Sequence, residues 1–271
     1  MKKAAPISPS TSTAARRPAR EIAPPSLSAA ARPGVPLYKE VRRLMVDAVS
    51  SGEWPPASAI PSEKVLASRF GVAMGTLRKA VDELVAEHVL IRQQGRGTFV
   101  ARHDRARLMF HFFHIVGADG SKETPTVELH AFARGRADAD EAAHLGIAEG
   151  APVFRIVNIL KLVGVPVIMD RIAIAQARFP GMTLTAFRDR PNTIYHLYQN
   201  SFGITVLRTA ERLRAVAADA DGARSLGVKT GSPLLEIRRT ALTFNDEPVE
   251  YRRSLVNTAK HEYFSDLAKT V

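Results

Sequence analysis

The sequence predicts an α+β protein with two folded domains, and three observations carry this prediction. Apolar residues recur at helical spacing in three short segments between residues 37 and 88, and two short strand-like segments follow them. Strand and helix signals alternate from Leu108 onward, and within that part the sequence repeats itself. Such alternation and repetition favour a mixed α/β domain with an antiparallel sheet over residues 108–265. A chain of 271 residues has room for both domains.

The first predicted helix covers residues 37–51 and ends at Gly52. Its expected buried face follows the 3–4 spacing of a helix and consists of Leu37, Val41, Leu44, Met45, Ala48 and Val49. Ser62 is the expected N-cap of the second helix, because its hydroxyl can accept from a free backbone amide, and Gly71 permits the turn that ends it. The second helix is expected to bury Val65, Leu66 and Phe70.

The third predicted helix runs from about Gly75 to His88. Two short strands follow it, Val89–Arg92 and Thr98–Val100, and two glycines in the loop between them supply positive φ angles. Three helices followed by such a wing make a winged helix-turn-helix over residues 37–103. That fold places its recognition helix in the DNA major groove and its wing against the backbone or the minor groove.

DNA-reading residues are expected on the first turns of the third helix and at the tip of the wing. An outward arginine can grip a phosphate or the N7/O6 edge of guanine, and a threonine can contact a phosphate or a thymine methyl. An arginine between two glycines suits insertion into the minor groove. The candidate DNA-binding residues are Ser62, Lys64, Met74, Thr76, Arg78, Lys79, Gly95, Arg96 and Gly97. Any one of these charges alone is as readily a solvated surface residue, so the prediction depends on the set.

An internal repeat lies in the second part of the chain. The pattern Asp138-Ala-Asp, Leu145-Gly146 and Gly150-x-Pro152 recurs 81 residues later as Asp219-Ala-Asp, Leu226-Gly227 and Gly231-x-Pro233. Each copy predicts a short helix and then a hairpin, Val153–Leu162 with Val167–Ile174 and Leu234–Phe244 with Val249–Val256. Two such copies related by a pseudo-twofold axis would pair into one sheet and leave a cleft near the axis.

Composition bounds the partners and the cell compartment. The net charge is +11, and residues 1–36 hold six of the basic residues and only one Glu. This Pro-, Ala- and Ser-rich segment is expected to be a disordered basic tail that either touches phosphates without sequence preference or has no role. The absence of cysteine excludes disulfides and thiolate chemistry. No apolar run approaches the ~20 residues that span a bilayer, so no membrane partner is expected.

Several motifs resemble the GntR family of bacterial transcription regulators. They are Ile60-Pro61-Ser62-Glu63-Lys64, Phe70-Gly71-Val72, Thr76-Leu77-Arg78-Lys79-Ala80 and Gln94-Gly95-Arg96-Gly97-Thr98-Phe99-Val100. The second part resembles the UTRA effector-binding domain of the HutC subfamily through Arg212-Leu213-Arg214-Ala215, Leu226-Gly227-Val228, Gly231-Ser232-Pro233-Leu234-Leu235 and Glu247-Pro248-Val249-Glu250-Tyr251. The resemblance covers residues 37 to about 265. It implies a chorismate-lyase-like effector domain and a dimeric cytoplasmic regulator, usually a repressor, which a small metabolite releases from a palindromic operator.

The chain departs from the family pattern where the third helix begins. The family usually has Ser-Arg-x-Thr-Val-Arg, and this chain has Ala73-Met74-Gly75-Thr76-Leu77-Arg78. The capping serine and a frequent DNA-contacting arginine are therefore both replaced, and loss of the cap costs ~1 kcal/mol. Lys64 also replaces a common arginine and loses its bidentate geometry. We expect an operator that differs from the family consensus.

The resemblance also points to the effector site. Sugar-phosphate sensors of this subfamily often carry two arginines at the positions of Asn158 and Leu160, so a phosphosugar is not expected here. The candidate effector-binding residues are Asp170, Thr193, Tyr195, Glu211, Arg214, Glu250 and Arg253. Three of them are acidic, which favours a ligand with an amine, an imidazole or several hydroxyls. The alternative is that Glu211, Arg214 and Glu250 neutralise one another across the sheet.

No cofactor, metal or catalytic set is expected. His111 and His114 would point to opposite faces of a strand, and no nucleophile triad or phosphate loop stands out. Two other functions stay open, a DNA-bound enzyme that uses the lyase-like domain and a non-specific DNA-binding protein that uses the tail. The expected partners are double-stranded operator DNA, a small-molecule effector and a second copy of the chain, because one recognition helix reads too few base pairs. The expected location is the bacterial cytoplasm, at the nucleoid when the protein is bound to DNA.

Overall fold

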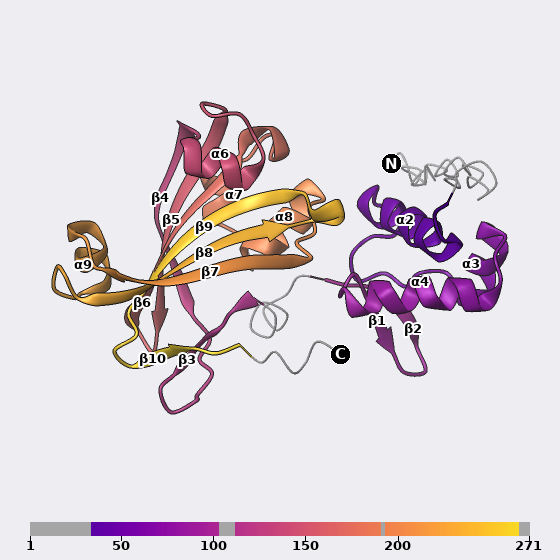
Figure 1. Ribbon diagram of the computed structural model, residues 1–271, viewed down its shortest axis with the longest axis horizontal. Helices are drawn as coiled ribbons and strands as arrows, with labels where there is room; N and C mark the ends of the chain where they lie inside the picture. Colours follow the sequence, from indigo (N-terminus) through magenta and orange to yellow (C-terminus); the bar gives the residue numbers. More distant parts are fainter. Residues whose placement is uncertain (1–33, 103–111, 191–192, 266–271) are drawn as a thin grey trace, which may run out of the picture.

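The computed structural model describes residues 34–102, 112–190 and 193–265 (Figure 1). Most of the predicted tail, and His111 at the start of the predicted effector domain, lie outside these described residues. Within them, no helix is long and apolar enough to cross a membrane. The α+β fold class is confirmed, with a helical first domain and a second domain built on an antiparallel sheet.

The first domain contains the five elements that the sequence predicts. Its helices are α2 (Leu37–Ser50), α3 (Glu63–Phe70) and α4 (Met74–Ala86), and its antiparallel wing strands are β1 (Leu90–Gln93) and β2 (Gly97–Val100). Ser62 caps α3 by accepting from the Val65 amide at 3.4 Å, and Gly71 ends it with a φ of 65°. Gly95 and Gly97 have the positive φ angles that the wing loop requires.

One core joins the three helices to the base of the wing, and Met45, Leu66, Leu77 and Leu84 are among its fully buried members. Two predicted core positions are wrong, because Leu37 is 53% exposed and Val65 is 55% exposed. Val65 precedes Leu66 by one residue, which turns it about 100° away from the narrow stripe that an eight-residue helix can bury. Leu37 opens its helix and lies beyond the reach of the core.

A six-stranded antiparallel sheet forms the second domain. Its spatial order is β4 (Thr126–Arg136), β5 (Pro152–Leu162), β6 (Val165–Ala175), β9 (Pro248–Val256), β8 (Pro233–Leu242) and β7 (Arg208–Ala217). The predicted helix-and-hairpin repeat is confirmed, with α6 (Ala139–Leu145) in the first copy and α9 (Ala220–Leu226) in the second. Each copy also begins with a strand, β4 or β7, that lies outside the predicted repeat. The two copies meet where β6 pairs with β9.

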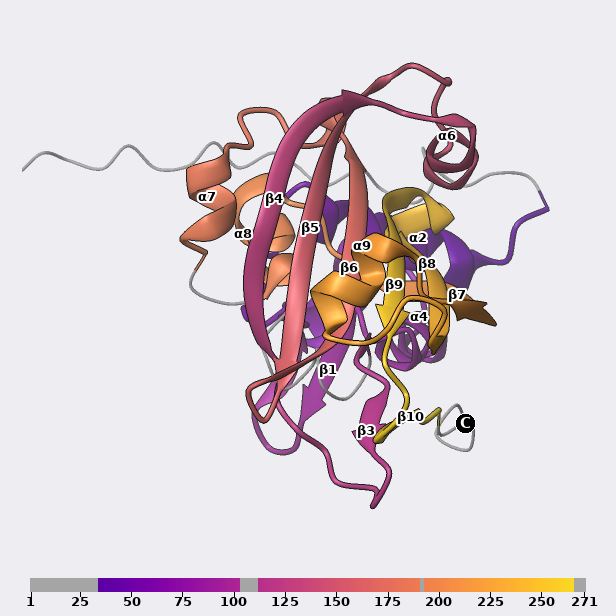
Figure 2. The same cartoon turned by 90° about the vertical axis from the view of Figure 1, so that its left-hand side faces the viewer.

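The helices cover both faces of this sheet. On one face, α6 packs on β9 and α9 packs on β6, so each helix covers a strand of the other copy. On the opposite face lie α7 (Leu184–Arg188) and α8 (Ile194–Phe202), whose apolar residues share a core with β5, β6 and β9. Figure 2 shows α7 and α8 grouped apart from α6 and α9.

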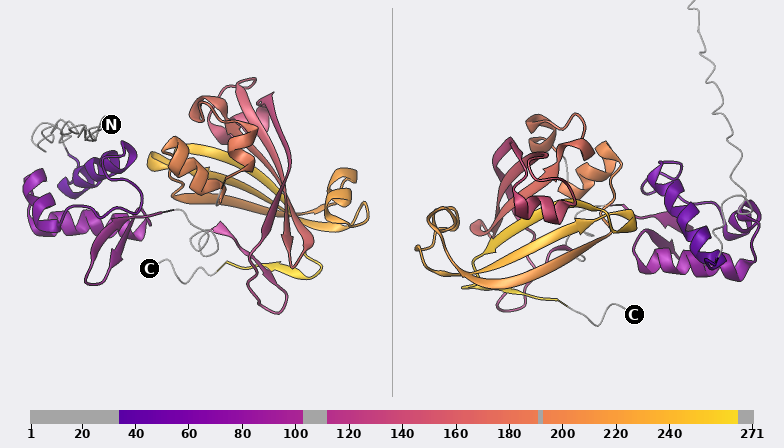
Figure 3. Two further views of the ribbon diagram at one scale, coloured as in Figure 1. Left: turned by 180° about the vertical axis from the view of Figure 1, so that it is seen from behind. Right: turned by 45° about the horizontal axis from the view of Figure 1, so that its top comes forward.

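A small second sheet closes one end of the α8 face. It pairs β3 (Ile115–Gly117) with β10 (His261–Tyr263), and Figure 3 shows it beneath one end of the large sheet. The domains touch directly as well, because Phe244, in the turn between β8 and β9, belongs to the core of the first domain and Leu207 packs against it.

Candidate functional site

The recognition helix α4 presents a mixed surface at its first turn. Its N-cap is Ala73, which makes no side-chain hydrogen bond to the helix. Gly75 and Arg78 are exposed and Thr76 is half-buried, whereas Met74 is half-buried against the core. Part of the Met74 side chain is therefore used for packing, and the remainder faces outward.

A concave surface of about 350 Å³ lies between the wing and the start of α3. It brings together four of the residues on this side of the domain, namely Ser62, Glu63, Arg96 and Gly97. Arg78 reaches the same place, because its Nε donates to Glu63 Oε2 at 2.8 Å while 62% of its side chain stays exposed. Sequence reasoning identified Arg78 and Arg96 and missed Glu63, the acidic residue to which Arg78 is bound.

The two lysines lie apart from this concave surface. Lys79 Nζ lies 4.0 Å from the ring centroid of Tyr38, so the ammonium group makes a cation–π contact with a residue of α2. Lys64 is exposed on α3 and is not among the residues that line the concavity.

Glu250 is the centre of a buried polar cluster on the α8 face of the large sheet, and its exposed fraction is 0%. The hydroxyls of Tyr195 and Tyr198, both on α8, donate to its carboxylate at 3.3 and 2.8 Å. Arg252 binds the same carboxylate at 2.8 Å. Burial, followed by the charge of Glu250, raises the pKa of both tyrosines, so they remain hydrogen-bond donors at neutral pH.

Arg252 connects Glu250 to a second buried acid, Asp170. Its Nη1 donates to Asp170 Oδ2 at 2.8 Å, and Ser254 donates to the other carboxylate oxygen at 2.6 Å. Asp170 is 2% exposed. Burial alone would lower the pKa of Arg252, but the charges of Glu250 and Asp170 outweigh it and raise that pKa. One arginine thus bridges two buried carboxylates, and its single positive charge balances half of theirs.

A third acid, Glu211, accepts hydrogen bonds from one residue of β8 and one residue of the small sheet. Arg239 Nε donates to it at 2.5 Å and the Tyr263 hydroxyl at 2.6 Å. Burial tends to raise the pKa of Glu211, but Arg239 and Tyr263 lower it by more, so the net shift is downward. The His114 ring lies beside Tyr263, with 5.2 Å between ring centroids, and burial lowers its pKa.

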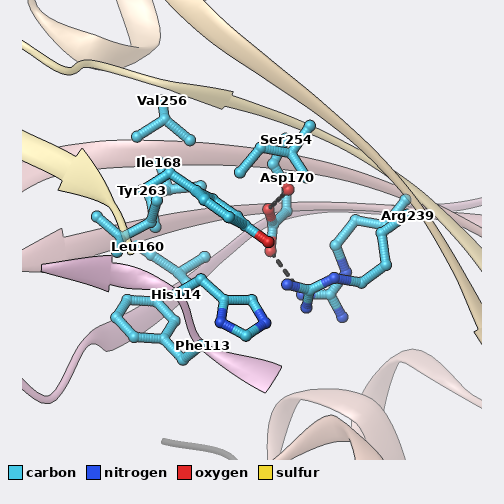
Figure 4. Close-up of a pocket in the computed structure, with 12 residues that line it drawn as sticks. Phe113, His114, Leu160, Ile168, Asp170, Arg239, Ser254, Val256 and Tyr263 are labelled. Carbon is cyan, nitrogen blue, oxygen red and sulfur yellow. Dashed lines mark hydrogen bonds and ion pairs between the residues drawn. The ribbon is translucent and has the colours of Figure 1, made fainter. Parts of the chain in front are cut away.

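Six of these residues line a small cavity between the large sheet and the β3–β10 pair, namely His114, Asp170, Arg239, Arg252, Ser254 and Tyr263, whereas Glu211, Glu250 and the two tyrosines of α8 lie behind its lining. Figure 4 shows Tyr263 and His114 on one side of it and Asp170, Ser254 and Arg239 on the other. The cavity measures about 30 Å³, which is room for a water molecule and not for a metabolite.

Asn158 lies next to Asp170, its partner in the β5–β6 register. It is 3% exposed, and its side-chain oxygen has no hydrogen-bond partner among the described residues. An unpaired buried acceptor costs about 1–3 kcal/mol. This is the position where sequence reasoning expected an arginine in a phosphate sensor, and the structure has an unused acceptor there.

The structure separates the seven candidate effector residues into three groups. Asp170, Tyr195, Glu211 and Glu250 lie on the α8 face, whereas Arg214 and Arg253 lie on the α6 face, where both bind Glu236. Thr193 caps α8 by accepting from the His196 amide at 3.2 Å. The alternative, in which Glu211, Arg214 and Glu250 neutralise one another, is wrong, because each is paired with a different residue.

Arg239, Arg252 and Ser254 were missed, although a sequence signal for them existed. Side chains alternate between the two faces of a strand, so Arg252 and Ser254 share a face with Glu250 and Arg253 does not. Among the described residues, no three His, Cys, Asp or Glu side chains are placed to hold a metal ion.

Comparison with known protein families divides the chain where the structure does. Residues 37–100 match the model for bacterial regulatory proteins of the gntR family, and residues 120–262 match the UTRA domain. Each match falls on one of the two domains described above.

Whole-length relatives carry both domains. The protein named "Probable fructoselysine utilization operon transcriptional repressor" in Escherichia coli (strain K12) is 30% identical over 79% of this chain and 87% of its own. The histidine utilization repressor of Pseudomonas putida is 28% identical over 83% of this chain and 90% of its own.

A solved structure is similar to the second domain. It is the ligand-binding domain of a GntR-family transcriptional regulator from Bordetella bronchiseptica, with a TM-score of 0.56, 30% identity, and coverage of 58% of this chain and 98% of that one. YydK of Bacillus subtilis, with a TM-score of 0.51 and 15% identity over 86% of this chain and 99% of its own, shares the fold. The chain therefore belongs to the GntR family of bacterial regulatory proteins and is a DNA-binding transcriptional regulator with a UTRA domain.

Proposed function

We propose that this protein represses transcription by binding an operator as a homodimer, and that a small metabolite bound in the UTRA domain releases it. The observation that carries the proposal is the joint exposure of Arg78 on α4 and Arg96 on the wing beside one concave surface. Both relatives described above are named as repressors, which supports repression over activation of transcription.

Arg78 and Arg96 take different parts in DNA recognition. Arg78 leaves Glu63 and reads a guanine edge or a phosphate in the major groove, and a good bidentate base contact is worth about 1–3 kcal/mol. Arg96 enters the minor groove, where a narrow groove attracts a guanidinium. The set is completed by Ser62, Lys64, Met74, Thr76, Lys79, Gly95 and Gly97.

The homodimer follows from the information that one recognition helix can read. Two helices placed roughly 34–36 Å apart read two half-sites one helical turn from each other, and such an operator is palindromic. A protein of this kind works in the bacterial cytoplasm, at the nucleoid while it is bound to DNA.

The effector binds on the α8 face of the sheet, near Asp170, Glu211 and Glu250. The free side-chain oxygen of Asn158 adds an acceptor beside the carboxylates, so the ligand is a hydrogen-bond donor such as an amine, an imidazole or a polyol. Histidine and fructoselysine, which appear in the names of the relatives, both carry basic nitrogen. Binding displaces the β3–β10 pair, because the cavity beside it measures only about 30 Å³.

Footprinting of the DNA upstream of its own gene tests the DNA-binding half of the proposal. We expect the full chain to protect one palindrome. Arg78→Gln should lose about 1–3 kcal/mol of binding free energy and change its base preference. Arg96→Ala should reduce the slope of log affinity against log salt concentration by about 1. Arg224→Gln, an exposed change on α9, is the matched control and should bind as wild type does. Absence of any protected site, or normal binding by Arg78→Gln, would overturn this half.

Titration of the protein–DNA complex tests the effector half. Histidine, fructoselysine and a hexose phosphate serve as probes, and release by a nitrogen base without turnover is the expected result. Release by the hexose phosphate alone would contradict the proposed ligand chemistry. Catalytic turnover of any probe would instead favour the enzyme alternative, and equal affinity for all DNA sequences would favour the non-specific one.

A further inference from the structure

Helix α8 contacts two distant parts of the molecule at once. Tyr195 and Tyr198 donate to Glu250 at 3.3 and 2.8 Å. At the next residue, Gln199 Nε2 donates to the backbone carbonyl of Ala101 at 3.1 Å. Tyr195 lies three positions before Tyr198 and four before Gln199, so it neighbours both of these side chains on the surface of a nine-residue helix. A single rigid turn therefore separates the Glu250 cluster from Ala101.

Ala101 is the base of the wing. It follows the last residue of β2, is 1% exposed, and its own amide donates to the carbonyl of Val89 at 2.9 Å, just before β1. Val100 donates to the Ser58 carbonyl at 2.9 Å, which ties the same point to the connector after α2. The carbonyl that Gln199 holds is thus where both wing strands join the body of the DNA-binding domain.

The contact between Gln199 and Ala101 is buried on both sides. Gln199 is 3% exposed, and it also donates to the Thr205 hydroxyl at 3.3 Å. If α8 shifted without the wing, a buried carbonyl would lose its donor, which is costly in a site that excludes water. Phe244 and Leu207 also join the two domains, but apolar packing has no fixed direction and permits sliding.

We propose that Gln199 is a positioning residue of effector control, which passes a change in the hydrogen bonds of Glu250 to the base of the wing. A ligand that takes a hydrogen bond from Tyr195 or Tyr198 changes where α8 rests, and Gln199 carries that shift to Ala101. The inference rests on the proposed effector pocket. Coupling of this kind is reciprocal, so DNA bound at the wing also alters the Glu250 cluster.

We call the connection from Glu250 through Gln199 to Ala101 the relay. Hydrogen exchange on the full chain tests it without an effector or an operator. The variants are Tyr198→Phe, which removes a donor to Glu250, Gln199→Met, which keeps the size of the side chain and removes its amide, and the double variant. The readout is the exchange rate of wing amides in residues 89–101. We expect Tyr198→Phe to raise that rate about 10- to 100-fold, because a buried hydrogen bond to a charged group is worth factors in that range.

The relay predicts that the second change adds nothing to the first. In the Gln199→Met background, Tyr198→Phe should leave the wing exchange unaltered, since the connection is already cut. Asn200→Ala, an exposed change on the same helix, controls for disturbance of α8 itself and should leave the wing as in wild type. Circular dichroism verifies that each variant is folded.

Two results would overturn the inference. One is an unchanged wing in Tyr198→Phe, and the other is an equal effect of Tyr198→Phe with and without Gln199. Neither depends on DNA or metabolite, so a failure of the relay is distinguishable from a failure of the proposed repressor function.

Discussion

Arg171 on β6 lies directly opposite Arg253 on β9, and this pair marks the pseudo-twofold axis of the second domain. The offset between the two copies is 81 residues in their first hairpin strands, as for Val153 and Leu234. It becomes 82 in the second strands, because Arg171 and Arg253 are equivalent. The extra residue lies in the turn of the second hairpin, and the two equivalent arginines face each other at the centre of the sheet.

The two faces at this axis are expected to differ in their contribution to stability. Arg252→Met should lower the free energy of unfolding by about 3–5 kcal/mol, because it leaves Asp170 and Glu250 buried without their counter-charge. Arg171→Met is the matched control and should stay within about 1 kcal/mol of wild type, since it loses a partly exposed pair with Asp221 and relieves repulsion with Arg253. Urea denaturation followed by circular dichroism measures both, and equal losses would contradict the argument.

The uncapped start of the recognition helix predicts an easy gain of stability. Ala73→Ser should raise the free energy of unfolding of the first domain by about 1 kcal/mol, because Ala73 already has the extended backbone of an N-cap. Ser62→Ala should lower it by a similar amount, since Ser62 caps α3. Fluorescence of Trp54, the single tryptophan and buried in this domain, reports both unfolding transitions. Changes of the same sign in the two variants would sink the capping argument.

Glu63 is expected to restrain the affinity for DNA. Its carboxylate holds Arg78 at 2.8 Å and lies 3.9 Å from Arg92, so it competes with phosphate for both cations. Glu63→Gln should therefore strengthen non-specific binding and steepen its salt dependence by about one counterion per freed arginine. Fluorescence anisotropy at several salt concentrations, with random-sequence duplex DNA, gives the slope. A slope equal to that of wild type would show that Glu63 does not restrain these arginines.

The sequence predicts the fold well because local signals agree with it. The cap at Ser62, the wing glycines and the repeated motif that begins at Asp138 each specify their element through nearby residues, and the structure has all of them. The sequence does not predict the strands β4 and β7, because they are edge strands with mostly exposed residues and neither shows a buried apolar run.

The effector candidates are harder to predict, since they depend on which residues share a face. Glu250 and Arg253 are three positions apart on one strand and must point to opposite sides, as do Glu211 and Arg214. The period of two identifies Arg252 as the partner of Glu250, but pairing across strands, such as Arg252 with Asp170, needs the register. Nothing in the residues near Gln199 indicates that it reaches Ala101, 98 positions earlier.

The second domain should lose stability in mildly acidic solution through His114. Burial lowers its pKa from the ordinary 6.5, with Glu211 opposing and Arg239 adding to that shift. The neutral ring is therefore favoured by folding, so its contribution is complete above about pH 6.5 and is lost as the pH falls towards the folded-state pKa.

The control for this titration is the exposed His130 on β4. Between pH 7 and 5.5, His114→Gln should flatten the fall of unfolding free energy, by no more than about 1.4 kcal/mol per pH unit for one proton. His130→Gln should leave the slope unchanged. If both variants follow the wild-type curve, His114 does not determine the pH dependence of the unfolding free energy. The other ionisable groups that face the His114 ring are Glu211, Arg239 and Tyr263.

The two hairpin turns of the repeat have different residue types at a position with a positive φ angle. Val163, at the tip of β5–β6, has a φ of +46° and is 81% exposed, although a β-branched side chain rarely adopts that conformation. Asn245, in the turn between β8 and β9, has a φ of +58°, which asparagine tolerates. Val163→Asn should therefore create the Asn-Gly pair favoured in tight hairpins and stabilise the domain by about 0.5–1 kcal/mol. Asn245→Val should destabilise it by about 1–2 kcal/mol. Thermal unfolding of the two variants beside wild type measures both shifts, and a destabilising Val163→Asn would mean that the valine makes a contact worth more than its strain.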